Sequence, residues 1–269
     1  MVDLCGDGQT TCPKPANLPV GRSQGSALRT AAGNPLLCGG DYEDSTCLEY
    51  IPETDSWANG PVMTGSRVDT TSVEFPNGTF WIMGSYRGPD VYTTELLDGD
   101  IFVDGPSLPL LGNVGFPCST QVSNDITFYG NNFGYLYEDG IGDFERTEDM
   151  LYTAYGASCG AATLQNGTKI VVVAGGITSS TAQSRVQIFD LETRQWSEGP
   201  PLPSPLKYGL SVPYGNSFLV VGGRNEQNTD VGTVYQFDPI NLSWIIRPEA
   251  LALPRSYFFM TSVDKERFC

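Results

Sequence analysis

The segment Val172-Val173-Ala174-Gly175-Gly176 decides the fold of this chain, because it is the clearest copy of a pattern that recurs at a nearly fixed period. In this pattern a short apolar run ends in two small residues. The first glycines of the copies are Gly39, Gly84, Gly130, Gly175 and Gly222, at spacings of 45, 46, 45 and 47 residues. Recurrence at such a period is typical of an array of equal structural units.

Aromatic residues keep step with the glycines. After each of three glycine pairs comes a second apolar run, and a tryptophan stands seven residues beyond the aromatic residue of that run. The resulting pairs are Tyr50 with Trp57, Phe189 with Trp196, and Phe237 with Trp244. A proline-rich turn such as Gly199-Pro200-Pro201-Leu202-Pro203 then leads to the next unit. Short apolar runs separated by turn residues predict β-strands, so the chain is expected to be all-β.

These features resemble the repeats of the kelch family, which combine a double glycine, a spaced Tyr or Phe and Trp, and a Gly-x-x-Leu/Met-Pro turn. The resemblance extends from about Asn17 to Cys269 and is weakest around Gly130, where no tryptophan follows. It implies a β-propeller of four-stranded blades. Glycine suits close backbone contacts, and large rings fill the space between blades. The residues assigned to this structural role are Gly39, Gly40, Trp57, Gly84, Gly130, Gly175, Gly176, Trp196, Gly222, Gly223 and Trp244.

Six blades are the favoured number, and five are the alternative. The end of the chain, from Tyr257 to Cys269, repeats the layout of Ala27 to Cys38 and therefore predicts the start of a further blade. We expect residues 1–16 to supply the outer strand or strands of that closing blade, and residues 17–269 to form the propeller as one domain. A blade shared by both ends of the chain would close the ring without an exposed sheet edge.

The chain contains no histidine and has a formal charge of −16. Histidine is the commonest metal ligand and the commonest general acid or base near neutral pH. Its absence excludes Ser-His-Asp and Cys-His nucleophiles, and it means that the copper site of kelch oxidases resembling galactose oxidase cannot be transferred to this chain. We therefore predict no catalytic residue, no cofactor and no metal ligand. The negative charge also argues against a nucleic-acid partner.

The seven cysteines are widely scattered and include no Cys-x-x-Cys pair, which is typical of isolated disulfides in an oxidising compartment. The hairpin and blade positions suggest three pairings. They are Cys38 with Cys47, Cys118 with Cys159, and Cys269 with either Cys5 or Cys12. One cysteine is left over, either free or bonded to another chain. Reduced cysteines in a cytosolic kelch protein are the alternative.

Three Asn-x-Ser/Thr sequons begin at Asn77, Asn166 and Asn241. The first two contain Asn-Gly and are expected in two-residue hairpin turns, so turn chemistry alone partly explains them. Together with the cysteines, the sequons favour a secreted glycoprotein. No apolar stretch is long enough to span a bilayer, and the first residues do not resemble a signal peptide. A secretion signal would therefore have been removed.

The kelch resemblance implies a non-catalytic, extracellular module for protein–protein interaction. We expect a protein partner to contact the blade loops, and a basic partner would suit the acidic ones. The candidate loop residues are Asp41, Tyr42, Glu43, Tyr86, Phe133, Asp139 and Asp143. The alternative is a propeller that binds a small ligand or a glycan at its channel mouth. A deep pocket lined by exposed Tyr and Trp would favour that alternative.

Overall fold

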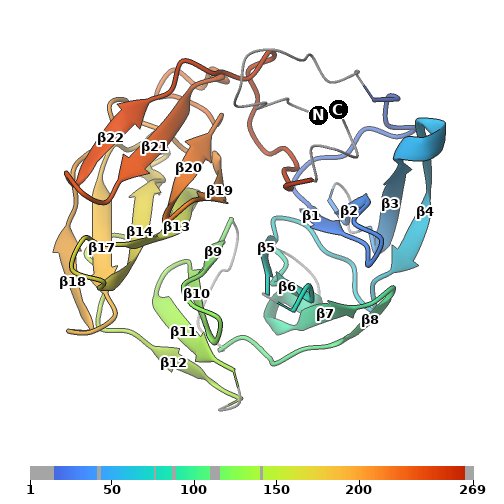
Figure 1. The fold of residues 1–269 in the computed structure, drawn as a ribbon, viewed down its shortest axis with the longest axis horizontal. Coiled ribbons are helices and arrows are strands. Elements are labelled where there is room, and N and C mark those ends of the chain that lie inside the picture. The colour runs from blue at the N-terminus through green and yellow to red at the C-terminus, as the bar shows by residue number, and fades with distance from the viewer. Residues whose placement is uncertain are drawn as a thin grey trace. The chain divides into compact units, whose positions relative to one another are not determined.

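A computed structural model of the protein describes residues 15–40, 44–75, 77–86, 89–109, 116–139 and 142–263. Five four-stranded antiparallel sheets follow one another along these residues (Figure 1). In each sheet, every strand pairs with the strand that follows it in the same sheet. In the fourth sheet, a small separate hairpin is inserted between the second and third strands. The sheets are the blades of a β-propeller, numbered here along the chain.

The strands of the blades have the following bounds. Blade 1 contains β1 (Ser26–Arg29), β2 (Pro35–Cys38), β3 (Thr46–Ile51) and β4 (Ser56–Val62). Blade 2 contains β5 (Thr71–Glu74), β6 (Phe80–Met83), β7 (Thr94–Asp98) and β8 (Ile101–Asp104). Blade 3 contains β9 (Cys118–Gln121), β10 (Ile126–Gly130), β11 (Gly134–Glu138) and β12 (Phe144–Arg146). Blade 4 contains β13 (Ala157–Thr163), β14 (Lys169–Gly175), β17 (Val186–Asp190) and β18 (Gln195–Glu198). Blade 5 contains β19 (Leu210–Tyr214), β20 (Ser217–Val221), β21 (Val234–Asp238) and β22 (Ser243–Ile246).

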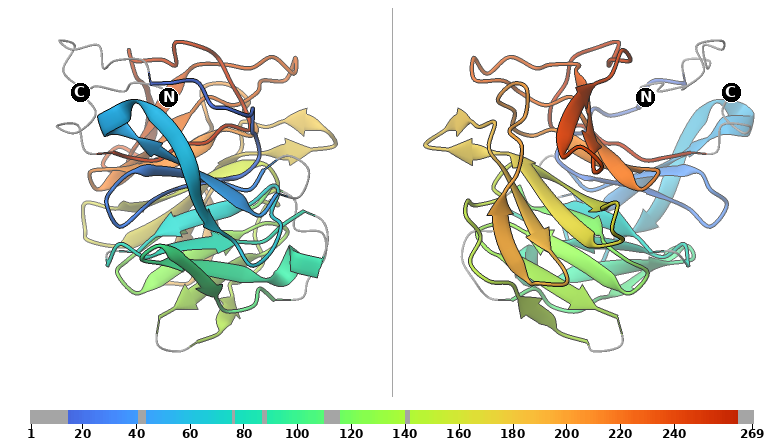
Figure 2. Two further views of the ribbon diagram at one scale, coloured as in Figure 1. Left: turned by 90° about the vertical axis from the view of Figure 1, so that its right-hand side faces the viewer. Right: turned by 60° about the vertical axis from the view of Figure 1, so that its left-hand side comes forward.

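Three short elements lie outside the four-stranded sheets. The 3-10 helices η1 (Pro52–Thr54) and η2 (Pro89–Tyr92) occupy connections in blades 1 and 2. The hairpin of β15 (Ile177–Thr178) and β16 (Thr181–Ala182) is inserted between β14 and β17, and Figure 2 shows it extending beyond the strands of blade 4.

The chain divides into two compact units. The first unit comprises residues 1–107 and 258–269 and contains blades 1 and 2. The second unit comprises Leu108–Tyr257 and contains blades 3, 4 and 5.

The second strands of the blades contribute a large share of the core. Every residue of β20 is buried, as are the five residues Ile170–Ala174 of β14. Their apolar side chains point to both faces of the sheet, because successive side chains alternate along a strand. Both faces of β14 accordingly pack against neighbouring blades of the second unit. In the second unit, one cluster joins Val172 of blade 4 to Phe218 of blade 5.

A ring pair links the third and fourth strands in four of the blades. The paired residues face each other in register, and their ring centroids are 5.1–5.3 Å apart. The pairs are Tyr50 with Trp57, Tyr137 with Phe144, Phe189 with Trp196, and Phe237 with Trp244. Blade 3 thus keeps the seven-residue spacing, with Phe144 in the position of the tryptophan. In blade 2 the corresponding register pair is Leu97 with Phe102.

The structure shows five blades, which is the alternative that the sequence left open, rather than the favoured six. Tyr257–Val263 forms no strand, although its pattern repeats that of a first strand. A first strand needs a second strand to pair with. The residues expected to supply it, 264–269, lie outside the described part of the chain. Residues 1–14 also lie outside the described part of the chain. The expected contribution of residues 1–16 to a closing blade therefore stays a prediction.

Ala16 lies within the described residues and belongs to no strand, but two hydrogen bonds attach it to blade 1. Its backbone N–H donates to Oδ1 of Asp55 at 2.6 Å, and its carbonyl accepts from Nε1 of Trp57 at 3.0 Å. The hydrogen bond from Ala16, together with one from the Tyr50 hydroxyl, lowers the pKa of the Asp55 carboxyl. Burial, and then the Asp55 carboxylate, raises the pKa of Tyr50 to about 12.

Two disulfides are present among the described residues. Cys38 and Cys47 are register partners on β2 and β3, with their Cα atoms 4.1 Å apart. Cys118 on β9 and Cys159 on β13 connect the first strands of blades 3 and 4, with Cα atoms 5.5 Å apart. Both pairings follow the positions that the repeat predicts. The third expected pairing, of Cys269 with Cys5 or Cys12, lies outside the described residues.

The two Asn-Gly sequons occupy three-residue loops, so the expected two-residue turn is wrong. In the β13–β14 hairpin the N–H of Leu164 donates to the carbonyl of Thr168, and the N–H of Gly167 donates to the carbonyl of Leu164, both at 2.9 Å. Only the glycine is left-handed, with φ of +90°. This is the common three-residue hairpin in which the left-handed residue closes the loop, and it needs a positive φ at one position only. The loop at Asn77 has the same pattern, with Gly78 at +84°.

The contact between blades 4 and 5 predicts the effect of one substitution. Gly160 on β13 lies against the buried ring of Phe218, and a Cβ atom at Gly160 would overlap with that ring. We expect Gly160→Ala to lower the free energy of unfolding by about 1–3 kcal/mol, the usual penalty for overpacking. Denaturant titration would measure it. Gly21→Ala is the control, since no atom lies within 4 Å of the added methyl group. Equal stability of the two variants would contradict the packing described here.

The disulfides are expected to stabilise the protein unequally. The Cys118–Cys159 bond closes a loop of 41 residues, and the Cys38–Cys47 bond closes one of 9. Constraint of the unfolded chain increases with loop length, so replacing both Cys118 and Cys159 by Ser should cost about 4 kcal/mol, and replacing Cys38 and Cys47 about 2–3 kcal/mol. Denaturant midpoints of the two double variants test this order. A larger loss from the shorter loop would contradict it.

Candidate functional site

The chain approaches each blade through a residue with a left-handed backbone, one or two positions before the first strand. We call these the entrance residues. They are Gln24, Asp69, Phe116, Gly156 and Tyr208, with φ from +50° to +65°, and Tyr257 repeats the geometry after blade 5 at +55°. A left-handed residue that carries a Cβ costs about 1–2 kcal/mol, and such strain concentrates at binding and active sites.

Backbone hydrogen bonds link the entrance residues within each unit. In the first unit the N–H of Asp69 donates to the carbonyl of Gln24 at 2.7 Å. In the second unit the N–H of Gly156 donates to the carbonyl of Phe116 at 3.0 Å, and the N–H of Tyr208 donates to the carbonyl of Gly156 at 2.8 Å. These bonds hold the strained residues in fixed positions.

Aromatic rings gather at the entrances of the second unit. Phe116 is at the centre of this group, which we call the entrance cluster. Its ring centroid lies 5.4 Å from that of Tyr155, 4.7 Å from that of Tyr208 and 5.4 Å from that of Tyr257. The centroids of Tyr208 and Tyr257 are 4.2 Å apart. All four residues are half-buried, so the cluster presents a partly exposed aromatic surface.

Two cations flank the entrance cluster. The ammonium of Lys207 lies 5.7 Å from the ring centroid of Tyr208, and the guanidinium of Arg224 lies 5.5 Å from that of Tyr257. Both distances are within the range of cation–π attraction. Nε of Arg224 also donates to Oδ1 of Asp230 at 2.9 Å, which fixes the guanidinium beside the ring.

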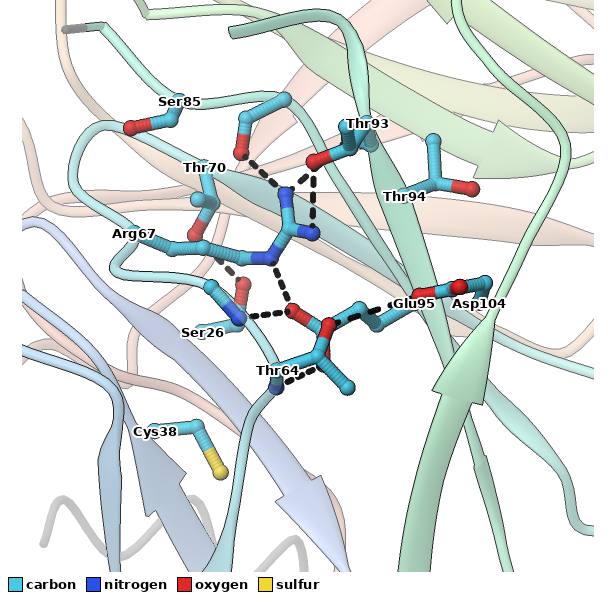
Figure 3. A network of polar contacts seen from close by, with 12 residues as sticks. Ser26, Cys38, Thr64, Arg67, Thr70, Ser85, Thr93, Thr94, Glu95 and Asp104 are labelled. Atoms are coloured by element: carbon cyan, nitrogen blue, oxygen red, sulfur yellow. Dashed lines mark hydrogen bonds and ion pairs between the residues drawn. The ribbon is translucent and has the colours of Figure 1, made fainter. Parts of the chain in front are cut away.

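A buried ion pair supports the entrance of blade 2 in the first unit. The Nε of Arg67 donates to Oε1 of Glu95 at 2.8 Å, and both side chains are at most 1% exposed (Figure 3). The guanidinium also donates to the carbonyl and the hydroxyl of Thr93, at 3.0 and 2.9 Å. The Glu95 carboxylate accepts from the N–H groups of Thr64 and Gly65, at 2.6 and 3.1 Å. The pair is therefore fully hydrogen-bonded and fixes the loop that leads to Asp69.

Comparison with known proteins agrees with this architecture. A family model described as the kelch motif matches residues 157–203, which cover blade 4 and the turn after it. Residues 157–203 thus carry a kelch motif, within a chain whose sheets form a β-propeller. A solved structure of YjhT is similar to the chain in fold, with a TM-score of 0.72, over 87% of this chain and 86% of that one, at 14% sequence identity. No curated protein sequence matches the chain.

Of the loop residues proposed from the sequence, those in blade 3 do not lie together. Phe133 lies between β10 and β11, where the guanidinium of Arg146 covers its ring at 4.0 Å. Asp139 and Asp143 are exposed and lie between β11 and β12, at the opposite end of the same blade. Tyr86 follows β6 in the first unit. The remaining candidates, Asp41, Tyr42 and Glu43, are outside the described residues.

Neither a metal-binding cluster nor a membrane-spanning helix is found among the described residues. Among the described residues, no group of three or more Cys, Asp or Glu side chains is arranged to hold a metal ion. No helix in the described part of the propeller has the length and apolar character needed to cross a membrane.

The entrance cluster was missed in the sequence because its members do not form a periodic motif. A signal was nevertheless present. Three of the aromatic residues stand at or next to an entrance residue that precedes a first strand: Phe116, Tyr155 and Tyr208. The fourth, Tyr257, has the same place before the segment after blade 5 that resembles a first strand. If the repeats are aligned on the starts of their first strands, these aromatic residues fall at equivalent or adjacent positions.

The buried ion pair predicts a specific stability effect. Glu95→Gln removes the charge that compensates Arg67, and breaking one side of a buried pair costs about 3–5 kcal/mol. Glu49→Gln is the matched control on the third strand of blade 1, where the amide still accepts from Nδ2 of Asn34 and the loss should be about 1 kcal/mol or less. Denaturant titration of both variants tests this. Equal losses would contradict a compensated buried charge at Glu95.

Proposed function

We propose that this propeller is a secreted, non-catalytic module that binds a protein partner, with the entrance cluster at the centre of its binding surface. The half-buried rings of Phe116, Tyr155, Tyr208 and Tyr257 beside Arg224 are the observation that carries this proposal. Tyrosine and arginine are enriched among the residues that dominate the binding energy of protein interfaces. Protein partners are also what the kelch fold commonly binds.

The spacing of the rings favours a protein over a small ligand. Ring centroids 4.2–5.4 Å apart are in direct contact, so nothing can be inserted between Phe116, Tyr208 and Tyr257. A ligand has to lie on the outside of the cluster. A protein surface can cover the exposed side of the cluster and exclude water around it, which is how interface hot spots gain energy.

The cluster is also preorganised. Tyrosine has only two side-chain torsions, and backbone hydrogen bonds fix the entrance residues before any partner arrives. Ordering side chains and loops is one of the main costs of association. A surface that is already ordered therefore loses little conformational entropy on binding.

Other features support secretion and the absence of catalysis. The bonds Cys38–Cys47 and Cys118–Cys159 fit an oxidising compartment, and the three sequons fit the same route. A chain without histidine lacks the side chain that most often transfers protons near neutral pH. The charge of −16 would attract a basic partner from a distance.

The test uses variants that remove rings without disturbing the backbone. Tyr208→Gly and Tyr257→Gly suit the left-handed conformation, so we expect them to fold. The full-length chain, produced in a secretory host, would be cross-linked to extracellular proteins, and the partner identified by mass spectrometry. Each variant should weaken binding of that partner by at least about tenfold, the lower range of a hot-spot loss.

Tyr214→Ala is the control for this experiment. Tyr214 is 46% exposed and ends β19, whereas Tyr208 precedes the start of the same strand. The control should bind the partner normally. If both glycine variants bind the partner as tightly as the unmodified chain, the entrance cluster is not the binding surface. If the chain binds arrayed glycans through Tyr208 and captures no protein, the glycan-binding alternative is correct.

A further inference from the structure

An apolar depression lies between two turns of the second unit. Its volume is about 400 Å³. One turn joins β13 to β14 in blade 4, and the other joins β21 to β22 in blade 5. The lining residues are Leu164, Gln165, Asn166, Pro239, Ile240 and Leu242. Ile240 and Leu242 are 62% and 45% exposed.

Asn166 lines this depression and also begins the sequon Asn166-Gly167-Thr168. Its side chain is exposed and held in one orientation, because Oδ1 accepts from the N–H of Thr168 at 3.0 Å. Within the described residues, Nδ2 of Asn166 makes no hydrogen bond. The nitrogen that carries an N-linked sugar is therefore accessible at the edge of an apolar surface.

We infer that Asn166 carries an N-linked glycan and that its first sugar lies in the depression. This inference rests on the proposed secretion of the chain. In the modification, Nδ2 loses one proton and forms a bond to the anomeric carbon of a lipid-diphosphate-linked oligosaccharide, and the bond from that carbon to the diphosphate breaks. The lipid diphosphate leaves as the other product.

The chemistry of the depression suits a pyranose ring attached at its edge. Such a ring has C–H groups on its faces and hydroxyl groups around its rim. Leu164, Ile240 and Leu242 offer aliphatic surface to a face, and the amide of Gln165 offers a donor and an acceptor to the rim. Covering exposed aliphatic surface is favourable in proportion to its area. A tethered sugar would therefore cover side chains that are otherwise exposed to water.

The other two sequons differ from Asn166. Asn77 precedes the left-handed glycine of an equivalent loop, with Oδ1 accepting from the N–H of Thr79 at 3.0 Å, but it is not among the residues that line the depression. The Nδ2 of Asn241 donates to Oδ2 of Asp238 at 2.8 Å, so its amide nitrogen is already engaged. Asn77 is thus a matched control for the turn without the apolar surface.

The experiment measures occupancy and thermal stability of the full chain secreted from a eukaryotic host. Peptide mass spectrometry after glycosidase treatment should find Asn166 modified. Asn166→Gln should lower the midpoint of thermal unfolding by about 2–4 °C relative to the glycosylated chain. Thr168→Ala removes the sequon but keeps the Asn166 side chain, and should give the same shift. An endoglycosidase that leaves only the first sugar should preserve the midpoint.

Two controls separate the stabilising effect of a sugar that lies in the depression from other effects of the substitutions. Asn77→Gln should leave the midpoint unchanged, and in the background of Ile240→Ser the loss caused by Asn166→Gln should disappear. A secreted, disulfide-bonded chain with Asn166 unmodified would overturn this inference alone. A modified Asn166 whose removal shifts nothing, or shifts the midpoint equally in the Ile240→Ser background, would also overturn it. A chain that is not secreted and keeps its cysteines reduced would instead contradict the proposed function.

Discussion

The hydrogen bond from the second glycine of a pair to the next entrance loop is the contact on which this architecture depends. The N–H groups of Gly40, Gly176 and Gly223 donate to the carbonyls of Arg67, Leu206 and Arg255, at 2.8, 2.9 and 2.8 Å. The first glycine is equally constrained: a Cβ at Gly175 would overlap with the Leu206 carbonyl, and φ there is +74°. In these three blades glycine suits both positions because backbone packs directly on backbone, in a conformation that other residues rarely adopt.

The same contact explains why aromatic residues can occupy strained positions. Once the glycine pair has fixed the entrance loop, the next residues have little freedom, and hydrogen bonds such as that from Tyr208 to Gly156 fix them further. The left-handed backbone at Tyr208 and Tyr257 is thus imposed by surrounding structure, as strained functional residues usually are. The packing that forms the blades therefore also creates the exposed ring cluster.

The repeat could be predicted from the sequence because it reflects burial, whereas the candidate site reflects local backbone geometry. The glycine pairs, the pair of Phe189 and Trp196, and the facing positions of Cys38 and Cys47 all follow from strand periodicity. Phe144 was overlooked because phenylalanine replaces the expected tryptophan while filling the same position. Strand periodicity does not reveal the left-handed entrance residues, since apolar alternation is independent of a positive φ, and only their place in the repeat marks them. Six blades were favoured over five because the apolar pattern of Tyr257–Val263 fits a first strand, for which the described residues contain no second strand.

The two ends of a blade can serve different purposes in the second unit. Strand β13 runs from Ala157, beside the entrance residue Gly156, to Thr163, just before the loop that holds Asn166. Seven strand residues span roughly 20 Å at about 3.3 Å each. A glycan at Asn166 would then lie at the end of blade 4 away from the entrance cluster, where it covers Ile240 and Leu242 without obstructing a partner. The net charge acts over longer distances than either feature, so for the proposed partner it would affect the rate of encounter, while the rings would determine how long the partner stays bound.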